Sequence, residues 1–199
     1  MAPCGTNDME SVKDTLKLCL EYCKRAVDIW TSDPAKTQHC FDLIFASQGA
    51  YEYIQFRETS PTRREALTNI RVGILEQKLV PMLVYIHDTN DRRLTYFSLA
   101  DCQKELYYLK NDESAKRAAI SNYERCLPLL INAESFHTKY LLAHTYYWLG
   151  ALHSKFTDSI SETKTFVSFT KFLAIARETP EVAINGMLEA SLAYVSARK

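Results

Sequence analysis

The chain has 199 residues, 47% of them hydrophobic, which is enough for one sizeable core and argues against a disordered polypeptide. Lys and Arg together number 24, and so do Asp and Glu, so the formal net charge is zero. This balance argues against a general nucleic-acid binder, because non-specific affinity for nucleic acid comes mainly from neutralising phosphates.

The expected location is intracellular, cytoplasmic or nuclear. No apolar run approaches the roughly 20 residues that span a bilayer, so we expect no membrane insertion. The N-terminus lacks a basic segment followed by an apolar one, which is the secretory pattern. None of the six cysteines forms a CxxC pair, and we expect free, reduced thiols.

Helix-start signals divide the chain. A capping residue precedes proline at Asp33-Pro34, Ser60-Pro61 and Thr179-Pro180. Proline suits the first helical position, because the N–H that it lacks would be unpaired there. Ser159 and Glu162 have the spacing of a capping box, which predicts a fourth start.

Apolar residues recur at helical spacing along the whole chain. The first stripe runs from Val12 to Trp30, the second from Cys40 to Ile54, and a third from Leu67 to Ile74. Pro81 then predicts a kink or a helix end. Five more stripes follow over 99–109, 115–130, 142–156, 166–176 and 183–194. We therefore predict an all-α fold, with a mobile tail over residues 1–8 and a single domain over 9–199.

Part of this pattern repeats. Leu106, Ala119 and Tyr123 form one copy, and the segment Trp148-Leu-Gly150 followed by Phe172 forms another. A weaker copy carries Gly49 and Tyr53 and then Ala66, Ile70 and Ile74.

These residues resemble the tetratricopeptide repeat over roughly residues 36–180. The resemblance implies antiparallel helical hairpins stacked as a short α-solenoid. In such a stack, small residues such as Gly150 let helices approach closely, and aromatics such as Phe172 fill the gap between units. Leu106 and Leu149 lie 43 residues apart, against about 34 in the family. An irregular closed helical bundle is the alternative.

The resemblance also implies a site, because the first helix of each tetratricopeptide hairpin lines a concave groove. His144, Tyr147 and Lys155 share one face of their helix and would point toward a bound peptide, with Tyr108 as the equivalent in the preceding hairpin. The alternative is that Tyr147 packs against a neighbouring helix.

Arg57, Arg63 and Arg64 flank the turn at Pro61 and form the second candidate site. They suit an acidic peptide or a phosphate, through charge-assisted hydrogen bonds. The alternative is a solvated helix start, although basic residues early in a helix oppose its macrodipole.

No catalytic signature is present, and we expect no enzyme and no cofactor. The five glycines are scattered singly, which excludes a Gly-rich phosphate loop, and no G-x-S-x-G is found. Cys19, Cys23, His39 and Cys40 form a conceivable zinc set, but Cys19 and Cys23 lie on an apolar stripe, so we expect core cysteines and no metal.

These observations favour a non-catalytic protein–protein interaction module, an adaptor or scaffold that binds a peptide or helix between its helical hairpins. One alternative is a structural subunit that associates, with itself or another chain, through the C-terminal helix bearing Met187, Leu188, Leu192 and Tyr194. Another is a helical-bundle enzyme or small-ligand carrier with an aromatic pocket built from Trp148, Phe166, Phe169 and Phe172.

Overall fold

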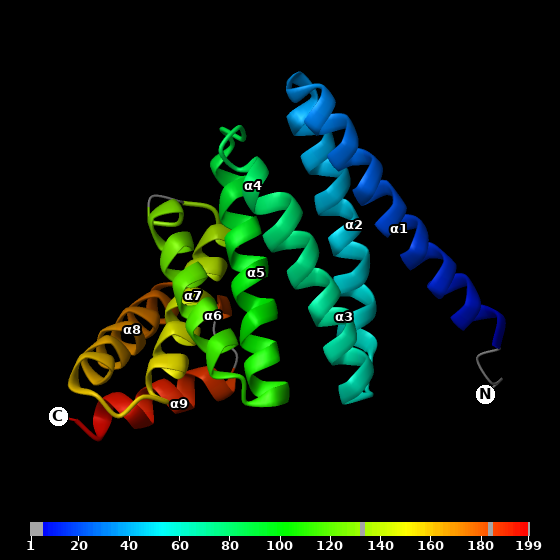
Figure 1. Ribbon diagram of the computed structural model, residues 1–199. Helices are drawn as coiled ribbons and strands as arrows, with labels where there is room; N and C mark the ends of the chain where they lie inside the picture. Colours follow the sequence, from blue (N-terminus) through cyan, green and yellow to red (C-terminus); the bar gives the residue numbers. More distant parts are fainter. Residues whose placement is uncertain (1–5, 132–133, 183–184, 199) are drawn as a thin grey trace. The chain divides into compact units, whose positions relative to one another are not determined.

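The computed structural model describes residues 6–131, 134–182 and 185–198, which form helices and turns and contain no strand. The all-α prediction is confirmed for this part of the chain (Figure 1). Two compact units are distinguished. The first comprises Met1–Asp88 and Glu105–Asn111, and the second comprises Thr89–Lys104 and Asp112–Lys199.

The first unit begins with α1 (Thr6–Ser32), α2 (Thr37–Arg57) and α3 (Pro61–Ile74). Of the tail predicted over residues 1–8, residues 1–5 lie outside the described chain and the remaining three belong to α1. Figure 1 shows α1 and α2 side by side and running in opposite directions, and α3 packs against α2 in turn.

Proline positions the turns of the first unit. The 3-10 turn η1 (Pro34–Lys36) joins α1 to α2, and the Asp33 carboxylate caps it by accepting the Ala35 N–H at 3.2 Å. Ser60 has the extended backbone that a following proline favours, with φ −77° and ψ 118°, and α3 begins at Pro61. Both prolines were predicted to begin helices. Pro61 begins α3 as predicted, whereas Pro34 opens a 3-10 turn and α2 begins at Thr37.

The third predicted helix continues past Ile74 through a π-helical turn, η2 (Leu75–Leu79), into α4 (Val80–Met82). Proline cannot donate to the carbonyl four residues before it, and its ring clashes with that carbonyl. The wider π turn precedes Pro81, and the helix ends one residue after it, as the proline predicted.

Helix α5 (Thr89–Lys110) contributes residues to both units. The second unit continues with α6 (Glu113–Cys126), η3 (Leu127–Leu129), α7 (Phe136–His153), α8 (Ser159–Glu178), η4 (Pro180–Val182) and α9 (Asn185–Ser196). Successive helices from α6 to α9 pack on one another. Pro128 ends the fifth predicted helix in a 3-10 turn, and Pro180 opens a 3-10 turn instead of an α-helix.

The cap of α8 differs by one residue from the predicted capping box. Asp158, not Ser159, is the N-cap, and its carboxylate accepts the Ser161 N–H at 2.8 Å. The same bond lowers the pKa of Asp158, because it stabilises the charged form.

Helix α8 packs tightly against Gly150 of α7. A Cβ built on Gly150 would lie 2.7 Å from Cδ1 of Phe169, so a larger residue there would force the ring to shift. The prediction that this glycine lets two helices approach closely is confirmed. Phe172, one turn further along α8, is fully buried in the cluster that also contains Tyr146 and Met187.

The C-terminal helix α9 uses most of its apolar residues inside its own unit. Met187 is buried, Leu188 packs on the same cluster, and the Tyr194 ring lies 5.3 Å from that of Phe169. Leu192 is the exposed member of the set proposed for association. Among the described residues, no helix is both long enough and apolar enough to cross a membrane.

Candidate partner-binding pocket

A pocket of about 600 Å³ opens among the three helices that begin the first unit. We call it the α1–α3 pocket. Each of α1, α2 and α3 contributes both apolar and charged side chains to its wall. The lining residues are Val12, Lys13, Leu16, Tyr53, Ile54, Arg57, Glu58, Arg63, Ala66 and Leu67.

One lining residue of the pocket, Leu16, also takes part in the contact between α1 and α2. The buried Tyr51 donates its hydroxyl proton to the Leu16 carbonyl at 2.8 Å and joins the two helices there. Helix α2 stops at Arg57, while α1 extends for 27 residues against 21 in α2. Val12, one helical turn before Leu16 on the same apolar stripe of α1, is exposed.

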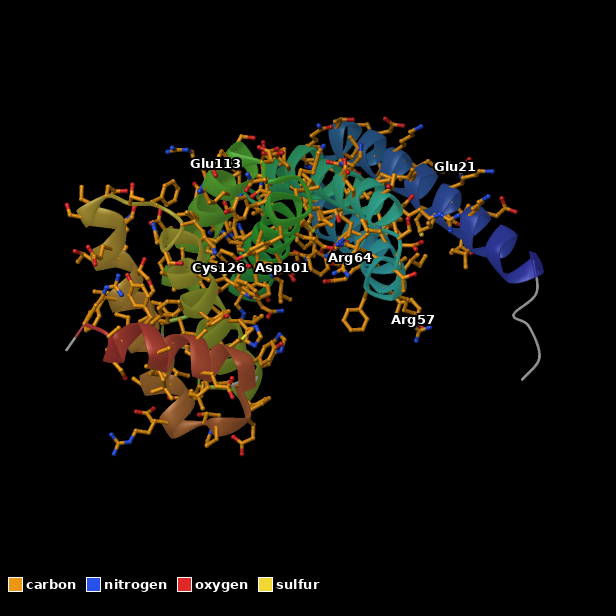
Figure 2. All side chains as sticks on the ribbon, turned by 90° about the horizontal axis from the view of Figure 1, so that it is seen from below. Glu21, Arg57, Arg64, Asp101, Glu113 and Cys126 are labelled. Atoms are coloured by element: carbon orange, nitrogen blue, oxygen red, sulfur yellow. The ribbon has the colours of Figure 1, made fainter. Side chains whose placement is uncertain are left out.

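Two of the arginines predicted as site residues border this pocket. The Arg57 guanidinium lies over the Tyr53 ring, 4.1 Å from its centroid. Arg63 Nη1 lies 4.0 Å from Oε2 of Glu58. Figure 2 shows Arg57 projecting outward from the end of α2. The structure thus brings Arg57 and Arg63 to one apolar surface.

Arg64, although adjacent in sequence to Arg63, has a different environment. Its Nε donates to Oε1 of Glu105, and the other oxygen of Glu105 accepts from Nε2 of Gln55. Gln55 in turn accepts from Nη1 of the buried Arg71 at 2.6 Å. These bonds join α2, α3 and residue 105 within the first unit, so Arg64 belongs to a structural polar network.

The residues predicted from the repeat resemblance have different environments. His144 is 6% exposed, and its ring lies 4.0 Å from that of Tyr140. Burial lowers the pKa of His144 to about 4, with Lys104 adding to the shift and Asp101 opposing it. Its Nε2 has no hydrogen-bond partner among the described residues.

The other three residues of that set have separate environments. Tyr147 packs against Phe169 and Phe172, with ring centroids 5.9 and 5.5 Å away, which matches the packing alternative. Lys155 is exposed just after the end of α7. Tyr108 is half-exposed and belongs to the first unit, whereas the others belong to the second.

The apolar part of the α1–α3 pocket was not identified as a site from the sequence. Val12, Leu16, Ile54 and Leu67 were assigned to the core stripes of their helices, and Tyr53 to a repeat position. The spacing of apolar residues does not distinguish them from core positions, because it is the packing of α1, α2 and α3 that leaves this wall open.

The wall of the pocket carries few of the side chains that act as nucleophiles or metal ligands. Glu58 is the one carboxylate among the lining residues, and none of them is a histidine, cysteine, serine or threonine. Within the described ranges, no group of three or more His, Cys, Asp or Glu side chains is placed to hold a metal ion. Comparisons of this chain with protein-family models, curated proteins and solved structures found no match.

Proposed function

We propose that this chain is a non-catalytic protein–protein interaction module, and that the α1–α3 pocket receives a segment of the partner. The observation that carries the proposal is an apolar pocket of about 600 Å³ bordered by arginines that do not belong to the structural network around Arg71. Apolar surface supplies affinity, and flanking charges supply orientation and specificity.

The exposed apolar surface extends beyond the pocket itself. Tyr53 is 57% exposed and Phe56 is 85% exposed, and residues three apart on a helix are neighbours. An enclosed site for a small apolar ligand would cover such rings. An open surface with exposed aromatic residues is typical of a site for another protein.

The hairpin arrangement of the tetratricopeptide kind remains part of this proposal. Its support is the packing of successive helices, α1 on α2, α2 on α3, and α6 through α9 in order. Modules of this kind present binding surfaces between neighbouring helices, and the α1–α3 pocket has that type of location.

The test is photo-crosslinking from within the pocket. A photoreactive phenylalanine analogue replaces Tyr53 in one protein and the exposed Ile160 of α8 in a control. After irradiation in cell lysate, we expect a discrete protein adduct from position 53 that is absent from position 160. Val12→Asp, which places a charge on the exposed part of the wall, should abolish that adduct.

Circular dichroism establishes that each variant is folded. Identical adducts from both positions, or an adduct at position 53 that persists in Val12→Asp, would refute the proposal. Native mass spectrometry of the unmodified protein tests the alternative of a small-ligand carrier. A co-purified small molecule that is lost in Val12→Asp would support that alternative.

A further inference from the structure

The charges around the α1–α3 pocket indicate the chemistry of the segment that it binds. Three lining residues are cationic, namely Lys13, Arg57 and Arg63, and one is acidic, Glu58. This excess of positive charge is local, because the chain as a whole carries zero formal charge. A partner of opposite charge is therefore favoured at this surface.

The one carboxylate is already engaged. Glu58 Oε1 accepts the Ser60 N–H at 2.9 Å, and its other oxygen lies 4.0 Å from Arg63. Its side chain is only 19% exposed, against 64% for Arg63. Glu58 thus stabilises the turn before α3, and the cations present the more accessible charge.

Both guanidinium groups are available to a carboxylate. Arg57 places one face of its guanidinium over the Tyr53 ring, and this stacking leaves the N–H groups at its edge for planar acceptors. Arg63 is the third residue of α3, where the positive end of the helix dipole disfavours a cation. An anion beside Arg63 is attracted by the side chain and by the helix end together.

The helical wall also selects the backbone conformation of the partner. The pocket is built from α1, α2, α3 and the turn at Glu58, and the helices satisfy their backbone N–H and C=O groups internally. An extended peptide would find no strand edge with which to pair. A helix satisfies its own backbone groups and presents an apolar stripe at i, i+3, i+4 and i+7.

We infer that the occupant of the α1–α3 pocket is an acidic amphipathic helix of a partner protein. Its apolar stripe enters between Leu16, Ile54 and Leu67, and Asp or Glu residues flanking that stripe pair with Arg57 and Arg63. This inference rests on the proposed interaction function and specifies its partner.

The test is selection from a displayed peptide library on the full chain. The library has a fixed leucine stripe at helical spacing and randomised flanking positions, and a second library has the same composition with the stripe scrambled. Both libraries are selected for binding to three proteins, namely wild type, Arg57→Glu/Arg63→Glu and Lys24→Glu/Arg25→Glu. The last variant reverses two exposed charges of α1 that do not line the pocket.

We expect wild type and the Lys24/Arg25 control to enrich Asp and Glu at the flanking positions, and the Arg57/Arg63 variant to lose or invert that enrichment. The selected acidic peptide should bind the Arg57/Arg63 variant about tenfold more weakly than wild type in fluorescence polarisation. Added salt should weaken its binding to wild type as well.

The outcomes distinguish failure of the acidic-helix inference from failure of the proposed interaction function. Leucine-stripe peptides captured without charge preference, and lost in Val12→Asp, would overturn the acidic partner and leave the interaction function standing. Equal loss in both charge-reversal variants would also overturn it. No enrichment over the scrambled library would count against the inference and the proposed function together.

Discussion

The Arg71 guanidinium donates to Oε1 of Gln55 across 2.6 Å, and both side chains are almost completely buried. The same guanidinium donates to Oε1 of Gln48 at 3.2 Å and lies 3.0 Å from a carboxylate oxygen of Glu52. A single cation of α3 thus holds three polar side chains of α2. Because Gln48 and Gln55 are buried, these bonds matter more than the exposed ion pairs of the chain.

Replacing Arg71 with leucine should therefore be strongly destabilising. The change leaves Gln48 and Gln55 without their buried donor, and we expect a loss of about 3 kcal/mol in the free energy of unfolding. Urea denaturation followed by circular dichroism measures it. Arg63→Leu, in the same helix but exposed, should change stability by less than about 0.5 kcal/mol. Equal effects of the two substitutions would refute the structural role of the network.

A methyl group at Gly150 should destabilise the second unit. Alanine there would contact the Phe169 ring, which is itself confined between Tyr147 and Tyr194. We expect a loss of about 1–3 kcal/mol, the usual cost of overpacking. Gly73→Ala is the matched control, since a Cβ at Gly73 of α3 meets nothing within 4 Å. Alanine at that helical position should stabilise by about 0.5–1 kcal/mol. A stabilising Gly150→Ala would contradict the close packing of α7 on α8.

The cysteines should differ widely in reactivity. Cys19 is partly exposed, whereas Cys23, Cys40, Cys102 and Cys126 are buried. Burial also raises the pKa of the Cys126 thiol to about 12, although Arg93 and Thr145 act in the opposite direction. Alkylation of the native protein, followed by peptide mass spectrometry, should modify Cys19 well before Cys126.

Unfolding in denaturant should remove the difference between the two thiols. Comparable rates for Cys19 and Cys126 in the native protein would show that α6 opens readily. Cys4 lies outside the described residues and enters no part of this expectation.

Acid should destabilise the second unit through His144. Its pKa falls from 6.5 to about 4 on folding, so the unfolded chain binds more protons between these two values. The contribution of His144 to the free energy of unfolding is fully present above pH 6.5 and is lost progressively as the pH falls toward 4. The loss is at most about 3 kcal/mol, since one pKa unit corresponds to about 1.4 kcal/mol. Burial lowers the pKa of His153 as well, which adds to the same trend.

The measurement is urea denaturation at several pH values for wild type, His144→Gln and the exposed control His137→Gln. His144→Gln should flatten the dependence of stability on pH between 6.5 and 4, because its side chain does not titrate. His137→Gln should leave the slope unchanged. A wild-type slope of the opposite sign would show that His144 is protonated in the folded state.

The helices themselves follow from local chemistry, so the sequence predicts them well. Proline after a polar residue marks the turns at Pro34 and Pro61, and apolar spacing marks the buried face of each helix. Gly150 was singled out through the repeat resemblance, in which small residues let paired helices approach closely. Three boundary errors, at Pro34, Ser159 and Pro180, concern choices between adjacent caps and turns whose energies differ little.

The candidate site depended on contacts between residues far apart in the chain. Arg63 and Arg64 are neighbours in sequence, yet one borders an apolar pocket and the other pairs with Glu105, 41 residues away. Likewise, His144 and Lys155 share a helical pattern, but one is buried and the other exposed.

The sequence by itself determined that this chain is helical, where its main turns fall and which face of each helix is apolar, because those properties depend on neighbouring residues. Only the tertiary structure decided which part of an apolar face is covered. Val12 and Cys23 lie on the same stripe of α1, but Val12 is exposed and Cys23 is completely buried. Burial depends on what a distant segment places against a side chain, and that information is absent from the local pattern.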